Sequence, residues 1–282
     1  MSISINQIRD FSSLFSRSEV IRLLKNDFAS FDIKLERYNL VEKNKGNSYL
    51  NVLRKTYKVL EKNYPNEYIL KNGLINQWLI DELGSGNSVV FNEFRIGNAI
   101  ADLAMFNGVS KAFEIKTLLD KEYRLSNQLT EYKKVFNEIY IVVPKELLSK
   151  YICYDNTIGL IIYDSEISKF EKVRESQFNK EIDSMVLMNI LHTKEYKNIV
   201  KDYYQDFPLM NAFNQFDICK NLISKIPNEE LNKLFIEAIK KRNINNSFSK
   251  KSYKEFNQVC LSLNLKAQEK DMLINNLKTN II

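Results

Sequence analysis

An Asn107-Gly108 pair between two short apolar runs is the feature that most constrains the fold of this chain. Asn-Gly flanked by apolar segments is the strongest local signal for a β-hairpin. Because side chains alternate between the two faces of a strand, opposing Leu103 to Phe113 places the large apolar side chains on one face. This register requires a three-residue loop, residues 107–109, and the sequence therefore predicts a hairpin with that loop.

The same register predicts where the charged residues of the hairpin lie. Asp102 stands opposite Glu114 on the second face, and Lys116, two residues further along the strand, shares that face. A two-residue loop would shift the pairing by one and bury Asp102 beside Phe113, at a cost on the order of several kcal/mol for an unpaired carboxylate. The three-residue loop is therefore preferred, and it brings two carboxylates and one ammonium group together.

An amphipathic helix is predicted after the hairpin, from Asp120 to about Phe136, because apolar residues recur there at spacings of three and four. One stripe of this helix carries Arg124, Gln128 and Tyr132. Glu138–Val143 then predicts a short buried strand, which Pro144 ends.

Two elements are predicted ahead of the hairpin. Pro65 suits the first turn of a helix that continues to about Leu83 and ends at Gly84-Ser85-Gly86. Ser88–Ile96 predicts a strand, and this strand carries Glu93. The predicted order is therefore helix, three strands, helix, strand.

These residues together resemble the PD-(D/E)xK nuclease superfamily, in the form with the QxxxY element of RecB-like exonucleases. Each motif alone is common by chance, whereas the ordered set on the expected elements is specific. The resemblance covers about Glu67 to Val143, with Ala101 where the family name has Pro. More loosely, the chain is similar to an uncharacterised bacterial and phage branch of that superfamily. The superfamily resemblance is carried by Asp102, Glu114-Ile115-Lys116 and Gln128-x-x-x-Tyr132. The looser one is carried by Glu93-Phe-Arg-Ile-Gly, Glu114-Ile-Lys-Thr and Arg124-Leu125.

The resemblance implies a restriction-endonuclease-like α/β fold, with a mixed sheet in an α-β-β-β-α-β core, and hydrolysis of phosphodiester bonds, in DNA rather than RNA. Asp102, Glu114 and the Ile115 carbonyl would hold Mg²⁺ or Mn²⁺, which prefer hard oxygen ligands. Lys116 would orient the attacking water or stabilise the transition state. Gln128 and Tyr132 would contact the substrate backbone or hold the metal ligands.

Two further acids have alternative interpretations. Glu93 is a candidate for an additional catalytic acid. Glu67 sits where many members of the superfamily supply one, although acids are also favoured at helix N-termini by the helix dipole.

A second function class stays open: a binding module for nucleic acid or protein that keeps the nuclease fold without cutting, in a phage-defence or mobile-element system. The sequence favours the enzyme, because a chemically competent residue fills each motif position.

Other chemistries lack the residues that they need. The chain has a single histidine, His192, and three scattered cysteines, Cys153, Cys219 and Cys260, so a Cys/His zinc cluster and a disulfide framework are not expected. No nucleophile elbow lies near His192, and no Gly-rich phosphate loop is present.

Three consecutive parts are expected along the 282 residues: a helical N-terminal cap (1–63), the nuclease-like core (64–178) and a helical, basic C-terminal region (179–282). Within the cap, Asp32–Gly46 is polar and is expected to be a loop, with a short strand at Ile33–Tyr38 as the alternative.

The net charge of +6 comes from the C-terminal part of the chain, since Lys220–Ile282 contains 12 Lys and Arg against 6 Asp and Glu. Nucleic-acid phosphates are one expected partner of this charge, and an acidic protein is the other. The candidate phosphate-binding residues are Arg124, Lys240, Lys241, Arg242, Lys250, Lys251 and Lys254.

No apolar stretch approaches the length of a membrane span, and Met1-Ser-Ile-Ser-Ile lacks the features of a signal peptide. The sequence therefore predicts a cytoplasmic protein with no membrane partner. Its expected partner is nucleic acid, with a protein partner or a second copy of the chain as further alternatives.

Overall fold

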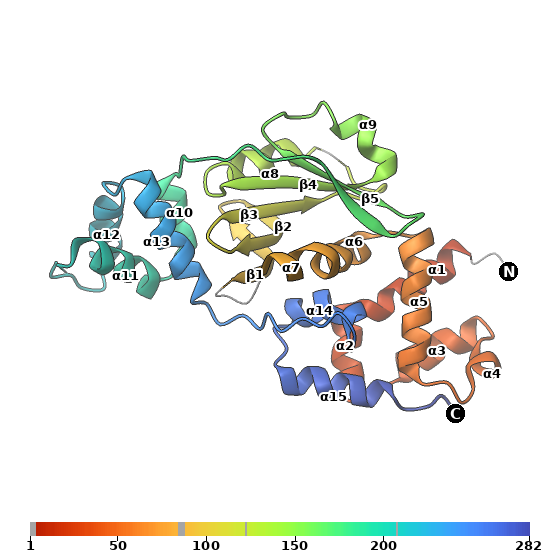
Figure 1. The fold of residues 1–282 in the computed structure, drawn as a ribbon. Coiled ribbons are helices and arrows are strands. Elements are labelled where there is room, and N and C mark those ends of the chain that lie inside the picture. Colours follow the sequence, from red (N-terminus) through yellow and green to blue (C-terminus); the bar gives the residue numbers. More distant parts are fainter. Residues whose placement is uncertain (1–3, 84–87, 122, 207) are drawn as a thin grey trace. The chain divides into compact units, whose positions relative to one another are not determined.

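The computed structural model describes residues 4–83, 88–121, 123–206 and 208–282, and it has a mixed α/β fold with one six-stranded sheet (Figure 1). The chain divides into two units, each with its own apolar core. Unit 1 comprises residues 1–80, 163–170 and 245–282, and unit 2 comprises residues 81–162 and 171–244. This division differs from the three consecutive parts expected from the sequence, because the last helices of the chain share the core of the N-terminal helices.

Unit 1 is largely helical, and several of its helices begin at a residue that caps them. Ser16, Ser48 and Asn66 each accept a hydrogen bond from the backbone N–H three residues later, which satisfies one of the unpaired donors of the first turn. Its helices are α1 (Ile5–Ser12), η1 (Ser13–Phe15), α2 (Arg17–Leu24), α3 (Ala29–Arg37), α4 (Val41–Asn44), α5 (Tyr49–Asn63), α6 (Glu67–Leu74), the π-helical segment η2 (Ile75–Leu79), η4 (Lys254–Phe256), α14 (Asn257–Ser262) and α15 (Ala267–Leu277).

The expected loop over Asp32–Gly46 is wrong, because α3 and α4 occupy most of this segment. Phe31 and Leu35, one helical turn apart, are fully buried, whereas Ile33 between them is 54% exposed. This pattern fits a helix and excludes the alternative strand, in which residues two apart would share a face.

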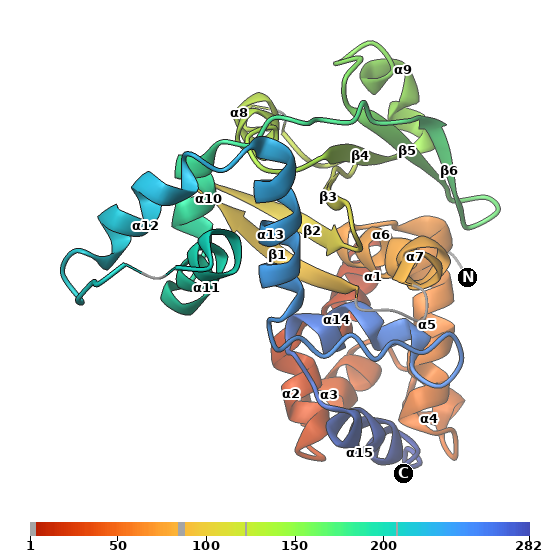
Figure 2. The same ribbon diagram turned by 60° about the vertical axis from the view of Figure 1, so that its left-hand side comes forward.

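Unit 2 contains most of the sheet, whose strand order is β1-β2-β3-β4-β5-β6 (Figure 2). β1 pairs antiparallel with β2, β2 pairs antiparallel with β3, and β3 pairs parallel with β4. The predicted order of three strands, helix and strand is found, and the structure adds a strand at β6 that the sequence did not indicate. The elements are α7 (Ile80–Leu83), β1 (Val89–Ile96), β2 (Ala99–Phe106), β3 (Ser110–Ile115), α8 (Leu125–Tyr132), β4 (Glu138–Pro144), η3 (Lys145–Leu147), α9 (Leu148–Tyr151), β5 (Gly159–Asp164) and β6 (Lys169–Arg174). The expected helix end at Gly84-Ser85-Gly86 lies outside the described residues.

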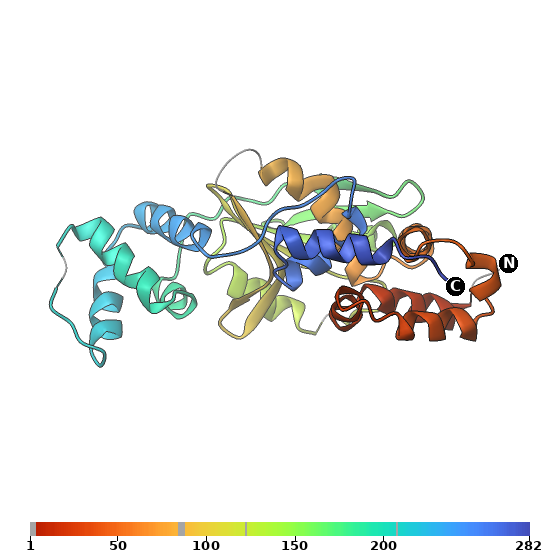
Figure 3. The same ribbon diagram turned by 90° about the horizontal axis from the view of Figure 1, so that it is seen from below.

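Four helices of unit 2 form a bundle beside the sheet, in which α10 contacts β1 and α13 contacts β2 (Figures 2 and 3). They are α10 (Ser184–Ile190), α11 (Thr193–Tyr204), α12 (Gln215–Ile223) and α13 (Asn228–Lys240). The C-terminal region is thus mainly helical, as predicted, but residues 241–253 form neither helix nor strand. No helix in the described segments combines the length and the apolar character needed to cross a bilayer.

The predicted register of the β2–β3 hairpin is confirmed. Leu103 pairs with Phe113 and Phe106 with Ser110, so that residues 107–109 form the three-residue loop. Gly108 has φ +101°, a left-handed conformation that glycine adopts without steric cost.

Candidate active site at the β2–β3 hairpin

Asp102 is held at the point where the β2–β3 ladder ends. The last pair of the ladder is Leu103 with Phe113, and one further step of the register puts Asp102 opposite Glu114. There the Asp102 Oδ2 atom accepts a hydrogen bond of 2.7 Å from the Ile115 backbone N–H. The carboxylate therefore takes over the place of a ladder acceptor, which fixes its position between the two strands.

Glu114 and Lys116 lie together on β3 and the residue after it, as the alternation predicts. Glu114 is only 2% exposed, and its Oε1 atom accepts a hydrogen bond of 2.7 Å from Lys116 Nζ. The same ammonium group lies 3.3 Å from Gln128 Oε1 on α8. The Lys116 backbone N–H donates to the Val142 carbonyl, so β4 holds the segment that carries this side chain.

Tyr132 joins this cluster from the last turn of α8 and is fully buried. Its hydroxyl lies 2.7 Å from Glu114 Oε2 and 2.6 Å from the carbonyl oxygen of Ile100. The structure therefore joins Glu114, Lys116, Gln128 and Tyr132 by hydrogen bonds, and Asp102, bound to the Ile115 N–H, is their charged neighbour. We call these five residues the hairpin site.

The electrostatics of the hairpin site raise the proton affinity of Glu114. Burial, together with the charge of Asp102, raises the pKa of Glu114 to about 7, although Lys116 and Tyr132 act in the opposite direction. Burial and the nearby Glu114 raise the pKa of Tyr132, so its hydroxyl stays neutral. Asp102 and Gln128 are half-buried, and they form the part of the cluster that a ligand reaches from solvent.

Glu93 stands opposite Asp102 in the β1–β2 register, between the pairs Asn92–Leu103 and Phe94–Ala101. Its φ is +60°, which is rare for a residue with a side chain, and it is exposed. The left-handed residue interrupts the alternation of β1, so that Phe91 and Phe94 both lie in the core with their rings 5.2 Å apart. Glu93, Asp102 and Glu114 thus occupy one level across three strands.

The carboxylate oxygens of the hairpin site are the type of ligand that Mg²⁺ and Mn²⁺ prefer. Mg²⁺ is commonly bound through one or two carboxylates, with waters and substrate phosphates as the other ligands, and Asp102 and Glu114 supply two carboxylates. Within the described residues, no group of three or more His, Cys, Asp or Glu side chains has the geometry of a metal site. The Ile115 backbone enters the site through its N–H group. A metal-binding role for its carbonyl stays a prediction.

Two other candidates, Glu67 and Arg124, have local contacts of their own. Glu67 belongs to unit 1, where it is in the first turn of α6 and pairs with Lys71 at 2.5 Å, which supports its interpretation as a helix-terminus acid. Arg124 is the exposed residue that precedes α8, and its guanidinium lies 5.1 Å from the centre of the Tyr123 ring.

The basic candidates from the C-terminal region fall into different units. Lys240, Lys241 and Arg242 lie at the end of α13 in unit 2, and Lys250, Lys251 and Lys254 lie in unit 1. Lys240 pairs with Glu237 at 2.7 Å. Arg242 donates hydrogen bonds of 2.8 and 2.7 Å to Glu195 and another to the Ile190 carbonyl, so its guanidinium links helices of the bundle. A phosphate contact of Arg242 stays a prediction.

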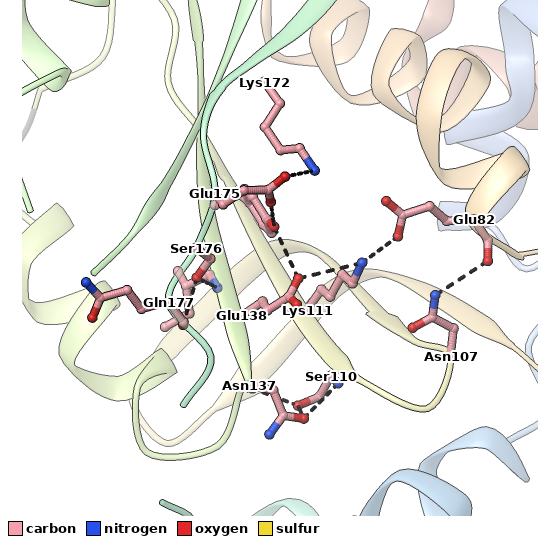
Figure 4. A network of polar contacts seen from close by, with 12 residues as sticks. Glu82, Asn107, Ser110, Lys111, Asn137, Glu138, Lys172, Glu175, Ser176 and Gln177 are labelled. Atoms are coloured by element: carbon pink, nitrogen blue, oxygen red, sulfur yellow. Dashed lines mark hydrogen bonds and ion pairs between the residues drawn. The ribbon is translucent and has the colours of Figure 1, made fainter. Parts of the chain in front are cut away.

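A second polar network, which the sequence did not indicate, surrounds the start of β3 (Figure 4). Lys111 binds Glu82 at 2.7 Å and lies 3.6 Å from Glu138, its neighbour on β4. The Tyr140 hydroxyl is 3.1 Å from both Glu138 and Glu175. Because the cations and hydroxyls of this network are matched by carboxylates, we interpret it as a support for the β3–β4 pair.

Known proteins resemble this chain to different degrees. Protein cII of Enterobacteria phage P4 is 27% identical over 173 residues, which cover 59% of this chain and 64% of that protein. The match thus spans less than two thirds of the relative. This chain also matches a solved structure, a protein of unknown function from Silicibacter pomeroyi. The match covers 50% of this chain and 94% of that protein, at 16% sequence identity and a TM-score of 0.34.

The family model described as "Bacteriophage P4 protein cII" matches residues 60–278, which is most of the chain and includes the hairpin site. This chain therefore belongs to the bacteriophage P4 protein cII family.

Proposed function

We propose that this protein is a metal-dependent nuclease that hydrolyses phosphodiester bonds, with DNA as its substrate, and that its core belongs to the PD-(D/E)xK superfamily. The observation that carries the proposal is the convergence of Asp102, Glu114 and Lys116 with Gln128 and Tyr132 in one cluster. The match to a phage protein family supports a role in a phage or mobile element.

Phosphodiester hydrolysis requires an activated water and neutralisation of the charge that develops on the phosphorane. A divalent ion held by Asp102 and Glu114 would supply a Lewis acid at the scissile phosphate and a water of lowered pKa. Lys116 lies 2.7 Å from Glu114 and is held by a backbone hydrogen bond, so its ammonium group is positioned to stabilise negative charge. Gln128 and Asp102 form the half-exposed side at which a phosphate would enter.

The test is a cleavage assay with linear, circular and single-stranded DNA and with RNA, in Mg²⁺, in Mn²⁺ and in EDTA. We expect cleavage of DNA that needs a divalent ion and is abolished separately by Asp102→Asn, Glu114→Gln and Lys116→Ala. Asp155→Asn is the matched control, because Asp155 pairs with Lys133 at 2.8 Å and takes no part in the cluster. Cleavage at wild-type rates by all three site variants would contradict the proposal.

A second function, a nuclease-like binding module without cleavage, is favoured by one specific observation. Both oxygens of Glu114 already have partners, Lys116 on Oε1 and the Tyr132 hydroxyl on Oε2. If Glu114 keeps its contacts with Lys116 and Tyr132 when divalent ions are present, it binds no metal and the cluster is a structural network. Binding of DNA without cleavage in Mg²⁺ or Mn²⁺, unchanged by Glu114→Gln, would favour this second function.

A further inference from the structure

Three lysines follow one face of helix α11 in the bundle of unit 2. Lys194, Lys197 and Lys201 are spaced by three and four residues, which places them on a single stripe of the helix. With Asn198 they line a hollow of about 360 Å³. The opposite face of α11 carries the buried Tyr196, Ile199 and Val200 and packs into the core, so the lysines lie on its outer side. We call Lys194, Lys197, Lys201 and Asn198 the α11 lysine face.

Two lysines of the α11 lysine face, Lys194 and Lys201, carry charge that no ion pair within the described ranges neutralises. Both are exposed, and Lys197 is half-buried beside Gln215. The two acids of the same helix behave differently. Glu195 is bound by Arg242, and with Asp202 and Glu237 it lines a neighbouring hollow that shares Asn198 with the α11 lysine face.

We propose that the α11 lysine face binds the phosphate backbone of nucleic acid. From Lys194 to Lys201 the helix rises about 10 Å, at 1.5 Å per residue. Phosphates of one DNA strand follow each other at about 3.4 Å along the helix axis, so this length matches roughly three successive phosphates. Ammonium groups are point charges that bind phosphates without reading the bases, so the contact is independent of sequence.

The lysine face continues toward the sheet. Lys194 also lines a second hollow of about 740 Å³, together with Phe91 and the ion pair of Glu195 and Arg242. Phe91 is on β1, two residues before Glu93, and β1 pairs with the strand that carries Asp102. A backbone held on α11 would thus adjoin a hollow that also borders Phe91 of β1.

This inference deepens the proposed function and rests on it for naming nucleic acid as the polyanion. The test is therefore made without metal, so that binding is separated from cleavage. Fluorescence anisotropy of a short fluorescein-labelled DNA duplex is measured in EDTA over a range of salt concentrations. The variants are the triple change Lys194→Gln, Lys197→Gln, Lys201→Gln, and a control of equal charge, Lys220→Gln, Lys225→Gln, Lys233→Gln, elsewhere in the same bundle.

We expect the α11 triple variant to lose affinity at low salt and the slope of log K against log salt to fall by about 2 to 3, since each duplex phosphate contact contributes roughly 0.9. The control variant keeps the wild-type slope. An α11 variant with wild-type affinity and slope would overturn the inference while leaving the proposed nuclease activity untouched. If the wild-type protein binds the duplex through these lysines but does not cleave DNA in Mg²⁺ or Mn²⁺, the proposed nuclease activity is wrong and the inference stands.

A labelled peptide of glutamates gives the competing outcome. If the wild-type protein binds this peptide more tightly than the duplex, and the α11 triple variant alone abolishes that binding, the surface recognises an acidic protein and the inference is wrong. If the wild-type protein binds no duplex in EDTA at low salt, the inference is also wrong, and the cleavage assay then decides the proposed function separately.

Discussion

The hydroxyl of Tyr132 lies within hydrogen-bond distance of two acceptors, Glu114 Oε2 at 2.7 Å and the Ile100 carbonyl at 2.6 Å. The hydroxyl proton is donated to one acceptor at a time. Its donation to Glu114 favours the ionised carboxylate, whereas burial raises the pKa of Glu114 to about 7. Helix α8 is thereby tied to β3 through the side chain on which the proposed activity depends.

Tyr132→Phe should lower the free energy of unfolding by about 1 to 3 kcal/mol, because buried acceptors lose their donor. Activity should fall but persist, since the charges of Asp102, Glu114 and Lys116 remain. Urea unfolding and the cleavage rate measure the two effects. Tyr140→Phe is the matched control, because its hydroxyl also contacts two carboxylates but belongs to the network around Lys111. A variant of Tyr132 with wild-type stability would show that the hydroxyl contributes little.

Glu114→Gln should change the pH dependence of stability in metal-free buffer. A carboxyl whose pKa is raised from 4.5 to about 7 binds more protons in the folded state. Stability therefore falls as pH rises between those two values and then levels off. Removing the charge should leave stability at pH 4 nearly unchanged and raise it at pH 8 by roughly 3 kcal/mol at most. Equal effects of the substitution at pH 4 and pH 8 would contradict the raised pKa.

Divalent ions should stabilise the wild-type protein through the hairpin site. Anything that binds the folded state alone adds RT ln(1 + [L]/Kd), about 1.4 kcal/mol at ten times Kd. Addition of Mg²⁺ or Mn²⁺ should therefore raise the melting temperature, and EDTA should reverse the rise. Asp102→Asn should abolish the shift, because asparagine can still accept the Ile115 N–H bond but brings no charge. The surface control Asp155→Asn should keep it, and a shift of equal size in both variants would place the ion elsewhere.

The elements that the sequence predicted depend on local signals. The hairpin register follows from alternation and a turn residue pair within 15 residues of chain, and it placed Asp102, Glu114 and Lys116 on one face. The stripe on α8 follows from helical spacing in the same way. These signals need no knowledge of distant contacts.

The features that the sequence did not predict depend on distant contacts. Helix α3 has only two fully buried side chains, Phe31 and Leu35. It is held in part by Tyr49, whose hydroxyl donates to Asp32 and whose ring stacks on Phe28 at 4.0 Å. The joining of the last helices to the N-terminal core is a contact across more than 200 residues. The positive φ at Glu93 could not be predicted, because the residue types around it are those of an ordinary strand.

Arg242 is expected to stabilise the bundle rather than to bind phosphate. Its side chain and that of Glu195 are 16% and 14% exposed, so removing one partner leaves a charge that is largely buried. Arg242→Gln should cost about 3 kcal/mol or more in urea unfolding. Adding Glu195→Gln should recover part of the loss, because the orphaned carboxylate is removed. An Arg242→Gln variant of normal stability with reduced affinity for DNA would restore the original expectation for this residue.

Glu93→Gly separates the structural role of position 93 from its chemical one. A left-handed residue with a side chain costs about 1 to 2 kcal/mol, and glycine removes this cost while adding backbone entropy to the unfolded chain. We therefore expect the variant to keep or slightly raise the melting temperature, with Phe91 and Phe94 still packed together. If Glu93 acts as an acid beside Asp102, cleavage falls in Glu93→Gly and equally in Glu93→Gln, which keeps a side chain but no charge. Loss of cleavage in Glu93→Gly alone would point to backbone position, and wild-type cleavage in both variants would remove Glu93 from the candidate residues.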